Sequence, residues 1–198
     1  MEADTREAMR QRILLAKPQE QVAGMFCESV YTAMSELLGS DEAVAVRSDT
    51  WPVWQWGDFS RYPLADLLRL VDAAAARLES REGMSYERAL EAMGTRVARR
   101  LLALPISKAY SMAVGGNPHD RLLLSIKSSQ FVAVYGERRY ERVGPKQGRL
   151  LFFRELLGPS WFRGVYLETG QSLPGVELSV TVEQCWEPGL EFQLLFSW

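Results

Sequence analysis

The sequence has few of the residues that build metal sites and disulfide frameworks. It contains two cysteines, Cys27 and Cys185, and one histidine, His119, among 198 residues. Cysteines this far apart make neither a metal-ligand spacing nor a disulfide framework, and they favour a reducing, cytoplasmic compartment. A single histidine cannot supply a histidine-rich metal site. The sequence therefore predicts a cytoplasmic protein with no metal and no cofactor.

Long apolar runs and an excess of one charge are also missing. No apolar run approaches the roughly 20 residues that a membrane span needs, and the charged first twelve residues lack the core of a signal peptide. Lys and Arg total 23 against 25 Asp and Glu, which gives a net charge of −2. Because this balance attracts neither nucleic acid nor an acidic membrane, we expect neither as a partner.

Motifs that carry catalysis are absent as well. The sequence has no Gly-x-Ser-x-Gly elbow, no Walker-type Gly-Lys-Ser/Thr loop and no Gly-x-Gly-x-x-Gly. His119 beside Asp120 forms a candidate base with an orienting carboxylate. The preceding Gly-Gly-Asn-Pro favours instead a loop histidine and a helix-capping aspartate. We therefore assign no catalytic residue.

Apolar residues are abundant enough for a sizeable core. They make up 47% of the chain, against 24% charged residues, which is typical of a globular protein rather than a disordered one. We expect an N-terminal extension over residues 1–18 and a single α+β domain over 19–198. Within that domain, 19–128 is expected to be helical and 129–198 to contain the sheet.

Apolar periodicity of three and four residues predicts four helices in the first part of the chain. The first covers 19–38 and the fourth 106–114. The second begins at Pro63 and reaches Leu78, and the third follows its cap Ser85 and reaches Leu104. Gly94 lies in the middle of the third helix, where it costs about 1 kcal/mol relative to Ala. We therefore expect a close helix contact at Gly94.

After about residue 130 the apolar period changes to two, which predicts strands over 131–135, 138–143 and 149–153. A helix over 160–169 follows, with Gly164 small enough to approach a sheet. The clearest alternation covers 176–183 and 190–198, two strands of an antiparallel hairpin joined at 187–189. The predicted fold is α+β, an N-terminal helical part packed on a C-terminal antiparallel sheet with one crossing helix, around one common apolar interior.

Several short segments together resemble a known family. They are Tyr62-Pro63-Leu64, Glu87-Arg88-Ala89-Leu90 with Met93-Gly94, Leu156-Leu157-Gly158-Pro159, Phe162-Arg163-Gly164 and the closing Phe-x-Leu-x-Phe-x-Trp strand. The chain resembles, over roughly residues 20–198, an uncharacterised paralogous family known from myxobacteria whose members carry a domain of unknown function. This resemblance implies relatives but no chemistry.

The order of helices, aromatic-glycine helix and final hairpin is more distantly similar to haem nitric-oxide-binding and vinyl-reductase-like sensor domains. That resemblance implies a small ligand held between the helices and the sheet. The haem-binding domains need an axial His on a helix before the first strand and a Tyr-x-Ser-x-Arg cluster. This chain has one His, in a turn, and its tyrosine segments read Tyr135-Gly-Glu-Arg-Arg and Tyr140-Glu-Arg-Val. The vinyl-reductase-like domains end with paired cysteines, of which only Cys185 has a counterpart here. We therefore expect no haem.

Two groups of residues are candidate binding sites. The first group is aromatic and consists of Trp51, Trp54, Trp56, Phe59 and Trp161. These residues line a cleft, anchor a partner protein, or cover the helical core. Nine basic residues against three acidic ones lie between 121 and 163. The basic patch within this stretch either binds an anion or acidic partner, or pairs with glutamates across strands: Arg138, Arg139, Arg142 and Lys146. Cys27, among apolar neighbours, is interpreted as a small core residue.

The leading functional hypothesis is a non-enzymatic, sensor-like module in signalling. It would bind a partner protein or a small apolar ligand between its helices and its sheet. One alternative is an enzyme acting on a small hydrophobic substrate through His119 and Asp120 or Cys185. Another is a self-associating scaffold, a homodimer formed through the final strand or the tryptophan segment.

Overall fold

The computed structural model describes residues 4–51, 55–173, 175–186 and 190–198. The helices are α1 (Arg6–Leu15), α2 (Gly24–Leu38), α3 (Ser40–Thr50), α4 (Leu64–Glu82), α5 (Tyr86–Ala103), α6 (Pro105–Val114), α7 (Pro118–Val132) and α8 (Pro159–Gln171). The strands are β1 (Gln21–Ala23), β2 (Arg61–Pro63), β3 (Ala133–Val134), β4 (Glu137–Gly144), β5 (Gln147–Phe153), β6 (Ser179–Trp186) and β7 (Glu191–Ser197). None of the helices described is long and apolar enough to cross a membrane.

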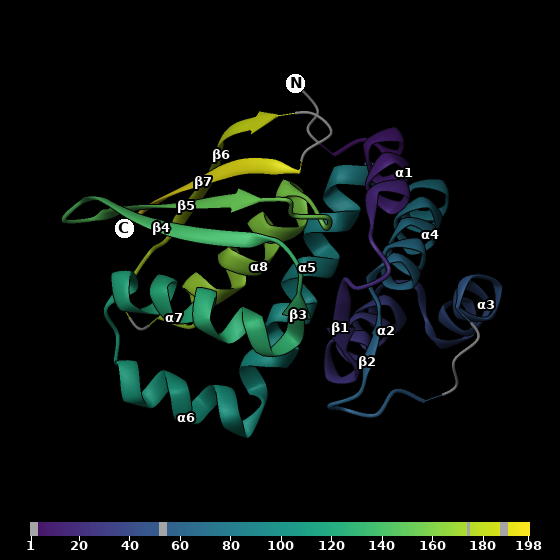
Figure 1. Cartoon of the computed structure of the whole chain (residues 1–198), viewed down its shortest axis with the longest axis horizontal. Coiled ribbons are helices and arrows are strands. Elements are labelled where there is room, and N and C mark those ends of the chain that lie inside the picture. Colours follow the sequence, from purple (N-terminus) through teal and green to yellow (C-terminus); the bar gives the residue numbers. More distant parts are fainter. Residues whose placement is uncertain (1–3, 52–54, 174, 187–189) are drawn as a thin grey trace.

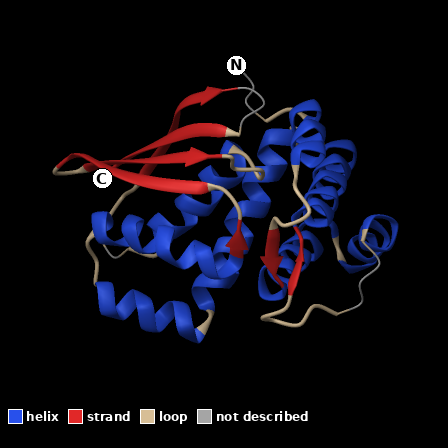
Figure 2. Cartoon of the chain, in the orientation of Figure 1, coloured by secondary structure: helices blue, strands red, loops and turns tan. Residues whose placement is uncertain are grey.

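A four-stranded antiparallel sheet covers α8, and the helices of the first two-thirds of the chain lie beside and beneath it (Figures 1 and 2). The strand order is β4-β5-β7-β6, with Leu150 opposite Leu194 and Phe152 opposite Phe192. These residues lie on the buried face of the sheet. The predicted α+β class and antiparallel sheet are confirmed.

Local capping signals explain where several helices begin. The Ser85 hydroxyl accepts a hydrogen bond from Arg88 N at the start of α5, as predicted. Pro63 precedes α4 directly. The Asn117 side chain accepts from His119 N, and Pro118 stands at the first position of α7, where its missing N–H costs nothing.

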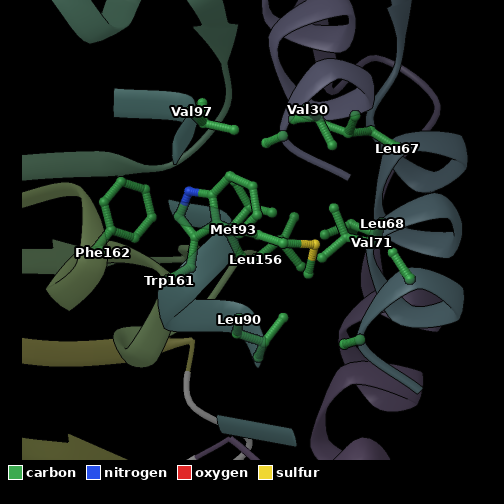
Figure 3. Packing of buried hydrophobic residues seen from close by; sticks show 14 of the residues in the cluster. Val30, Leu67, Leu68, Val71, Leu90, Met93, Val97, Leu156, Trp161 and Phe162 are labelled. Atoms are coloured by element: carbon green, nitrogen blue, oxygen red, sulfur yellow. The ribbon is translucent and has the colours of Figure 1, made fainter. Parts of the chain in front are cut away.

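Apolar side chains from the helices and the sheet form one continuous cluster. In Figure 3, Trp161 and Met93 lie between Phe162 and the α4 residues Leu68 and Val71. Phe192 and Val180 of the sheet are buried in the same cluster. The expectation of a common apolar interior is therefore confirmed.

Cys27 on α2 belongs to this cluster and is fully buried. Burial disfavours its thiolate and raises the pKa of the thiol to about 12. The interpretation of Cys27 as a core residue is confirmed, because a thiol with this pKa is neither a nucleophile nor a metal ligand near neutral pH.

The closest helix contact is the crossing of α5 and α8 in the middle of the molecule (Figure 1). A Cβ atom at Gly94 would collide with the backbone carbonyl of Trp161. A Cβ atom at Gly164 would collide with the backbone carbonyl of Glu91. The close contact predicted at Gly94 is confirmed, whereas Gly164 approaches α5 and not a sheet.

Three predicted boundaries are wrong. Residues 131–132 end α7, and only Ala133–Val134 are extended, where they pair with β1. Residues 21–23 form β1 and not the start of a helix. The penultimate strand begins at Ser179 instead of residue 176. Strand pairing sets the bounds of β1 and β6, and the helix that starts at Asn117-Pro118 continues through residues 131–132. Local apolar spacing does not contain this information.

Helix α1 packs on α4 and inserts Met9 and Arg12 into the interior. The Arg12 guanidinium contacts Asp4 Oδ1 at 2.5 Å, and both side chains are fully buried. Asp4 Oδ2 accepts a hydrogen bond of 2.6 Å from Ser160 N in the first turn of α8. Residues at the N-terminal end of the chain therefore complete the N-terminus of a helix near its other end.

Candidate functional site

A cavity of about 290 Å³ is lined by residues of α5, α6, α7 and α8 and of β3 and β4. Figure 1 shows where these elements lie. Its walls are mostly apolar and include Leu101 of α5, Phe131 and Val132 of α7, and Trp161 and Val165 of α8. This volume is near the lower end of the roughly 300–1,000 Å³ of small-molecule sites. The cavity therefore has the size and the surface for a small apolar ligand.

Arg138 and Tyr135 form the polar part of the wall next to the sheet, and both bond to the buried Glu155. Arg138 donates from Nη2 and Nε to Glu155 Oε2 at 2.7 and 3.3 Å, and Tyr135 donates to Glu155 Oε1 at 2.7 Å. Glu155 is 1% exposed. Arg138 also lies 4.7 Å from the ring centroid of Phe162. Leu157 N also donates to Glu155 Oε1 at 3.3 Å, so the carboxylate accepts from four donor atoms and neutralises the arginine.

Burial has opposite effects on the two groups that donate to Glu155. It raises the pKa of Tyr135 well above the usual tyrosine value, and the Glu155 charge raises it further. Burial, the largest single effect, lowers the pKa of Arg138, but the charge and hydrogen bonds of Glu155, together with Tyr166 and Tyr135, outweigh it and raise the pKa. Tyr135 is therefore neutral and Arg138 charged over the whole physiological pH range.

Hydroxyl groups in the cavity wall bond within the protein. Ser125 Oγ donates to Leu122 O at 2.7 Å and lies 3.0 Å from the Tyr166 hydroxyl. Ser129 Oγ donates to Ile126 O at 2.7 Å. Burial raises the pKa of Tyr166 above its usual value. Because these groups are already hydrogen-bonded, the interior favours a ligand of low polarity.

The structure separates the five aromatic candidates. Trp51 and Trp56 lie in the core, with ring centroids 5.4 Å apart, and they do not line the cavity. Phe59 and Trp161 both line it, Phe59 with 85% of its surface exposed and Trp161 buried. Trp54 lies outside the described residues.

The four basic candidates do not share one surface. Arg138 points inward to Glu155, whereas its neighbour Arg139 is exposed and pairs with Glu137 at 2.6 Å. Arg142 and Lys146 are exposed at the β4–β5 turn. Cross-strand pairing does occur further along the sheet, where Arg149 Nε lies 2.7 Å from Glu183 Oε2.

His119 lies in the first turn of α7 and not in a loop, and Asn117 rather than Asp120 caps that helix. Its Nδ1 contacts the Tyr140 hydroxyl, its Nε2 lies 3.1 Å from Pro145 O, and its ring packs against Trp198. The histidine is buried and does not line the cavity. Its two nitrogens hold α7 to the β4–β5 hairpin.

Sequence reasoning named Arg138 but missed Tyr135, which also lines the cavity, and Glu155, which bonds to both. Glu155 is 20 positions from Tyr135 and 17 from Arg138, so no local motif marks the group. One signal was available: Glu155 is a lone acid among the apolar residues 150–153 and 156–157. A charge in such a run requires a buried partner.

A family model described as "Protein of unknown function (DUF2378)" matches residues 15–198. The chain belongs to this family. Among proteins with curated functions, none matches it.

Solved structures of haem nitric-oxide-binding (H-NOX) proteins have a similar fold. The Fe(II) unliganded H-NOX protein from K. algicida has a TM-score of 0.69 at 11% identity, over 88% of this chain and 95% of that chain. The S. oneidensis H-NOX protein in the Fe(II)NO state has a TM-score of 0.66 at 13% identity, over 88% and 98%. A structure concerned with haem redox potential and porphyrin distortion has a TM-score of 0.66 at 10% identity, over 89% and 99%. At these identities the similarity concerns the fold alone.

The described residues of the cavity do not fit haem. Haem iron in proteins takes an axial His, Cys, Met or Tyr ligand, and no His or Cys is among the described residues that line the cavity. Tyr135 and Tyr166 line it, but their hydroxyls are engaged by Glu155 and Ser125 and their pKa values are raised. Arg138, which could hold a propionate, is already neutralised by Glu155. Met25 remains as a thioether without a histidine beside it.

Proposed function

We propose that this protein is a sensor-like module that binds a small apolar ligand, other than haem, in the cavity between its helices and its sheet. The observation that carries this proposal is the cavity of about 290 Å³, whose ion pair and hydroxyls are satisfied internally. The similarity in fold to H-NOX structures, one of them in an Fe(II)NO ligation state, supports a role in binding a small ligand. A partner protein that responds to ligand binding in a signalling pathway is part of this proposal.

Exposed apolar side chains at one end of the cavity give a ligand a way in. Phe59, Ile106 and Phe131 line the cavity and are 85%, 59% and 64% exposed. Large apolar groups grouped around an opening are typical of binding sites. The ligand would cover part of this surface and gain roughly 25 cal/mol for each Å² of apolar area removed from water.

Filling the cavity tests the proposal. The neutral dye N-phenyl-1-naphthylamine, whose fluorescence rises in apolar surroundings, is titrated into the wild type and into Leu101→Trp, which adds bulk to the cavity wall. The matched control is Leu14→Trp, because Leu14 is 85% exposed on α1. We expect Leu101→Trp to weaken dye binding at least about tenfold and Leu14→Trp to leave it unchanged.

A folded Leu101→Trp variant that binds the dye as well as the wild type would exclude this cavity. Native mass spectrometry of protein purified from its own host gives an independent result. We expect a bound small molecule that the Leu101→Trp variant does not retain.

A further inference from the structure

Two arginines line the cavity and differ in what neutralises them. Arg138 has the Glu155 carboxylate as a bidentate partner. Arg121, near the start of α7, donates from Nε to Gly115 O at 2.7 Å, and no carboxylate within the described part of the chain forms an ion pair with it. A carbonyl oxygen accepts one hydrogen bond but supplies no charge. The positive charge of Arg121 is therefore not cancelled at the cavity.

The described cavity wall contains no acidic side chain that would provide such a charge. Asp120 is adjacent in sequence but is exposed and does not line the cavity. A cation beside a mostly apolar surface attracts an anion more strongly than it would in water, because the local dielectric constant is lower. The planar guanidinium also matches a carboxylate, with two parallel N–H···O bonds.

The cavity changes in polarity along α7. From α7 it is lined by Arg121 and Leu124 near the α6–α7 turn, by Ser125, Ser128 and Ser129 further along, and by Phe131 and Val132 at the end of the helix. From residue 121 to residue 132 a helix rises roughly 16 Å at about 1.5 Å per residue. Along α7 the lining residues thus run from the charged Arg121 to the apolar Phe131 and Val132, a length that an elongated ligand would span.

We propose that the ligand is an elongated amphipathic acid, whose carboxylate binds Arg121 and whose apolar chain lies along α7 toward Phe131. This inference rests on the proposed function and adds the chemical class of the ligand. It assigns Arg121 as the residue that selects acids over neutral molecules of the same length.

The test compares two probes that differ only in the head group. Binding of dodecanoate and of 1-dodecanol, each below its aggregation concentration, is measured at pH 8, where the acid is ionised. The proteins are the wild type, Arg121→Gln, Arg121→Lys and the control Arg142→Gln, which removes an exposed arginine of β4. Circular dichroism shows whether each variant is folded.

We expect the wild type to bind dodecanoate about tenfold or more tightly than dodecanol. Arg121→Gln is expected to lose about tenfold in dodecanoate affinity and to keep its dodecanol affinity, since hydrogen bonds to charged groups contribute more than neutral ones. Arg121→Lys should retain part of the preference, and Arg142→Gln all of it.

Two results would overturn the inference while leaving the proposed function intact. One is equal wild-type affinity for the acid and the alcohol. The other is an equal loss of both affinities in Arg121→Gln, which would show that Arg121 acts only by bonding Gly115. If neither probe nor the neutral dye binds the wild type, the proposed function itself is wrong.

Discussion

The two halves of α5 face different surroundings. Over Leu90–Val97 the helix is buried against α8 and the core, with Gly94 in backbone contact with Trp161. From Ala98 onward it lines a cavity, and the following α6 and α7 expose Met112 and Phe131 by 84% and 64%. Packing density supports stability in the first half, whereas the second half keeps apolar surface available for binding. Helix α5 thus connects a tightly packed region to a region that can bind a ligand.

Removing the charge of Glu155 should have the largest effect, because it leaves a buried cation beside the cavity without its partner. Glu155→Gln leaves the Arg138 cation buried beside Phe162 without a counter-charge. We expect a loss of about 3–5 kcal/mol in the free energy of unfolding, measured by urea denaturation.

The matched change is Glu183→Gln, which breaks the partly exposed pair with Arg149. This variant should lose no more than about 1 kcal/mol. Equal losses in the two variants would contradict the structural role assigned to Glu155.

Adding one methyl group to the tightly packed half of α5 should have the next largest effect on stability. Gly94→Ala places a Cβ atom against the Trp161 backbone, so α5 and α8 must separate, at a cost of about 2–3 kcal/mol. Gly116→Ala, in the α6–α7 turn where nothing lies within 4 Å of the added atom, should change stability by about 0.5 kcal/mol or less. Thermal unfolding of both variants checks this difference. If Gly94→Ala had the same Tm as the wild type, the close contact between α5 and α8 would not limit the size of residue 94.

The smallest effect concerns pH. Because burial raises the folded-state pKa of Cys27 from 9.0 to about 12, its thiol contributes stability that is complete below pH 9 and decreases as the pH rises toward 12. The loss is on the order of 1 kcal/mol at pH 10, one pH unit above the unfolded-state pKa. Cys27→Ala should show a shallower decrease between pH 9 and 11 than the wild type. If the free energy of unfolding fell equally with pH in both proteins, groups other than Cys27 would cause the loss of stability.

The α+β fold was predictable because its strongest signals are local. Alternation over 191–197, the Ser85 cap and the Gly94 position each act within a few residues. Helix α7 was predicted only as part of the helical stretch 19–128 and without bounds of its own, since Ser125, Ser128 and Ser129 interrupt its apolar face where it borders the cavity. A face that lines a cavity lacks the full apolar stripe that a packed helix shows.

The candidate site was only partly predictable for a related reason. Aromatic residues could be found by composition, but whether they line a cavity or fill a core depends on neighbours distant in the chain. Phe59 and Trp161 reach the cavity, whereas Trp51 packs with Trp56 and Tyr62. The pairing of Glu155 with Tyr135 and Arg138 depends in the same way on the turn between β5 and α8.

The hydrogen bond from Ser160 N to Asp4 affects the order in which the molecule is assembled. The two residues are 156 positions apart, so the cap of α8 joins almost the first described residue to a helix made late in synthesis. Until α8 has been synthesised, the Asp4 carboxylate lacks this donor. Docking of α1 is therefore completed late, and this long closure is expected to slow folding more than any of the local hairpins.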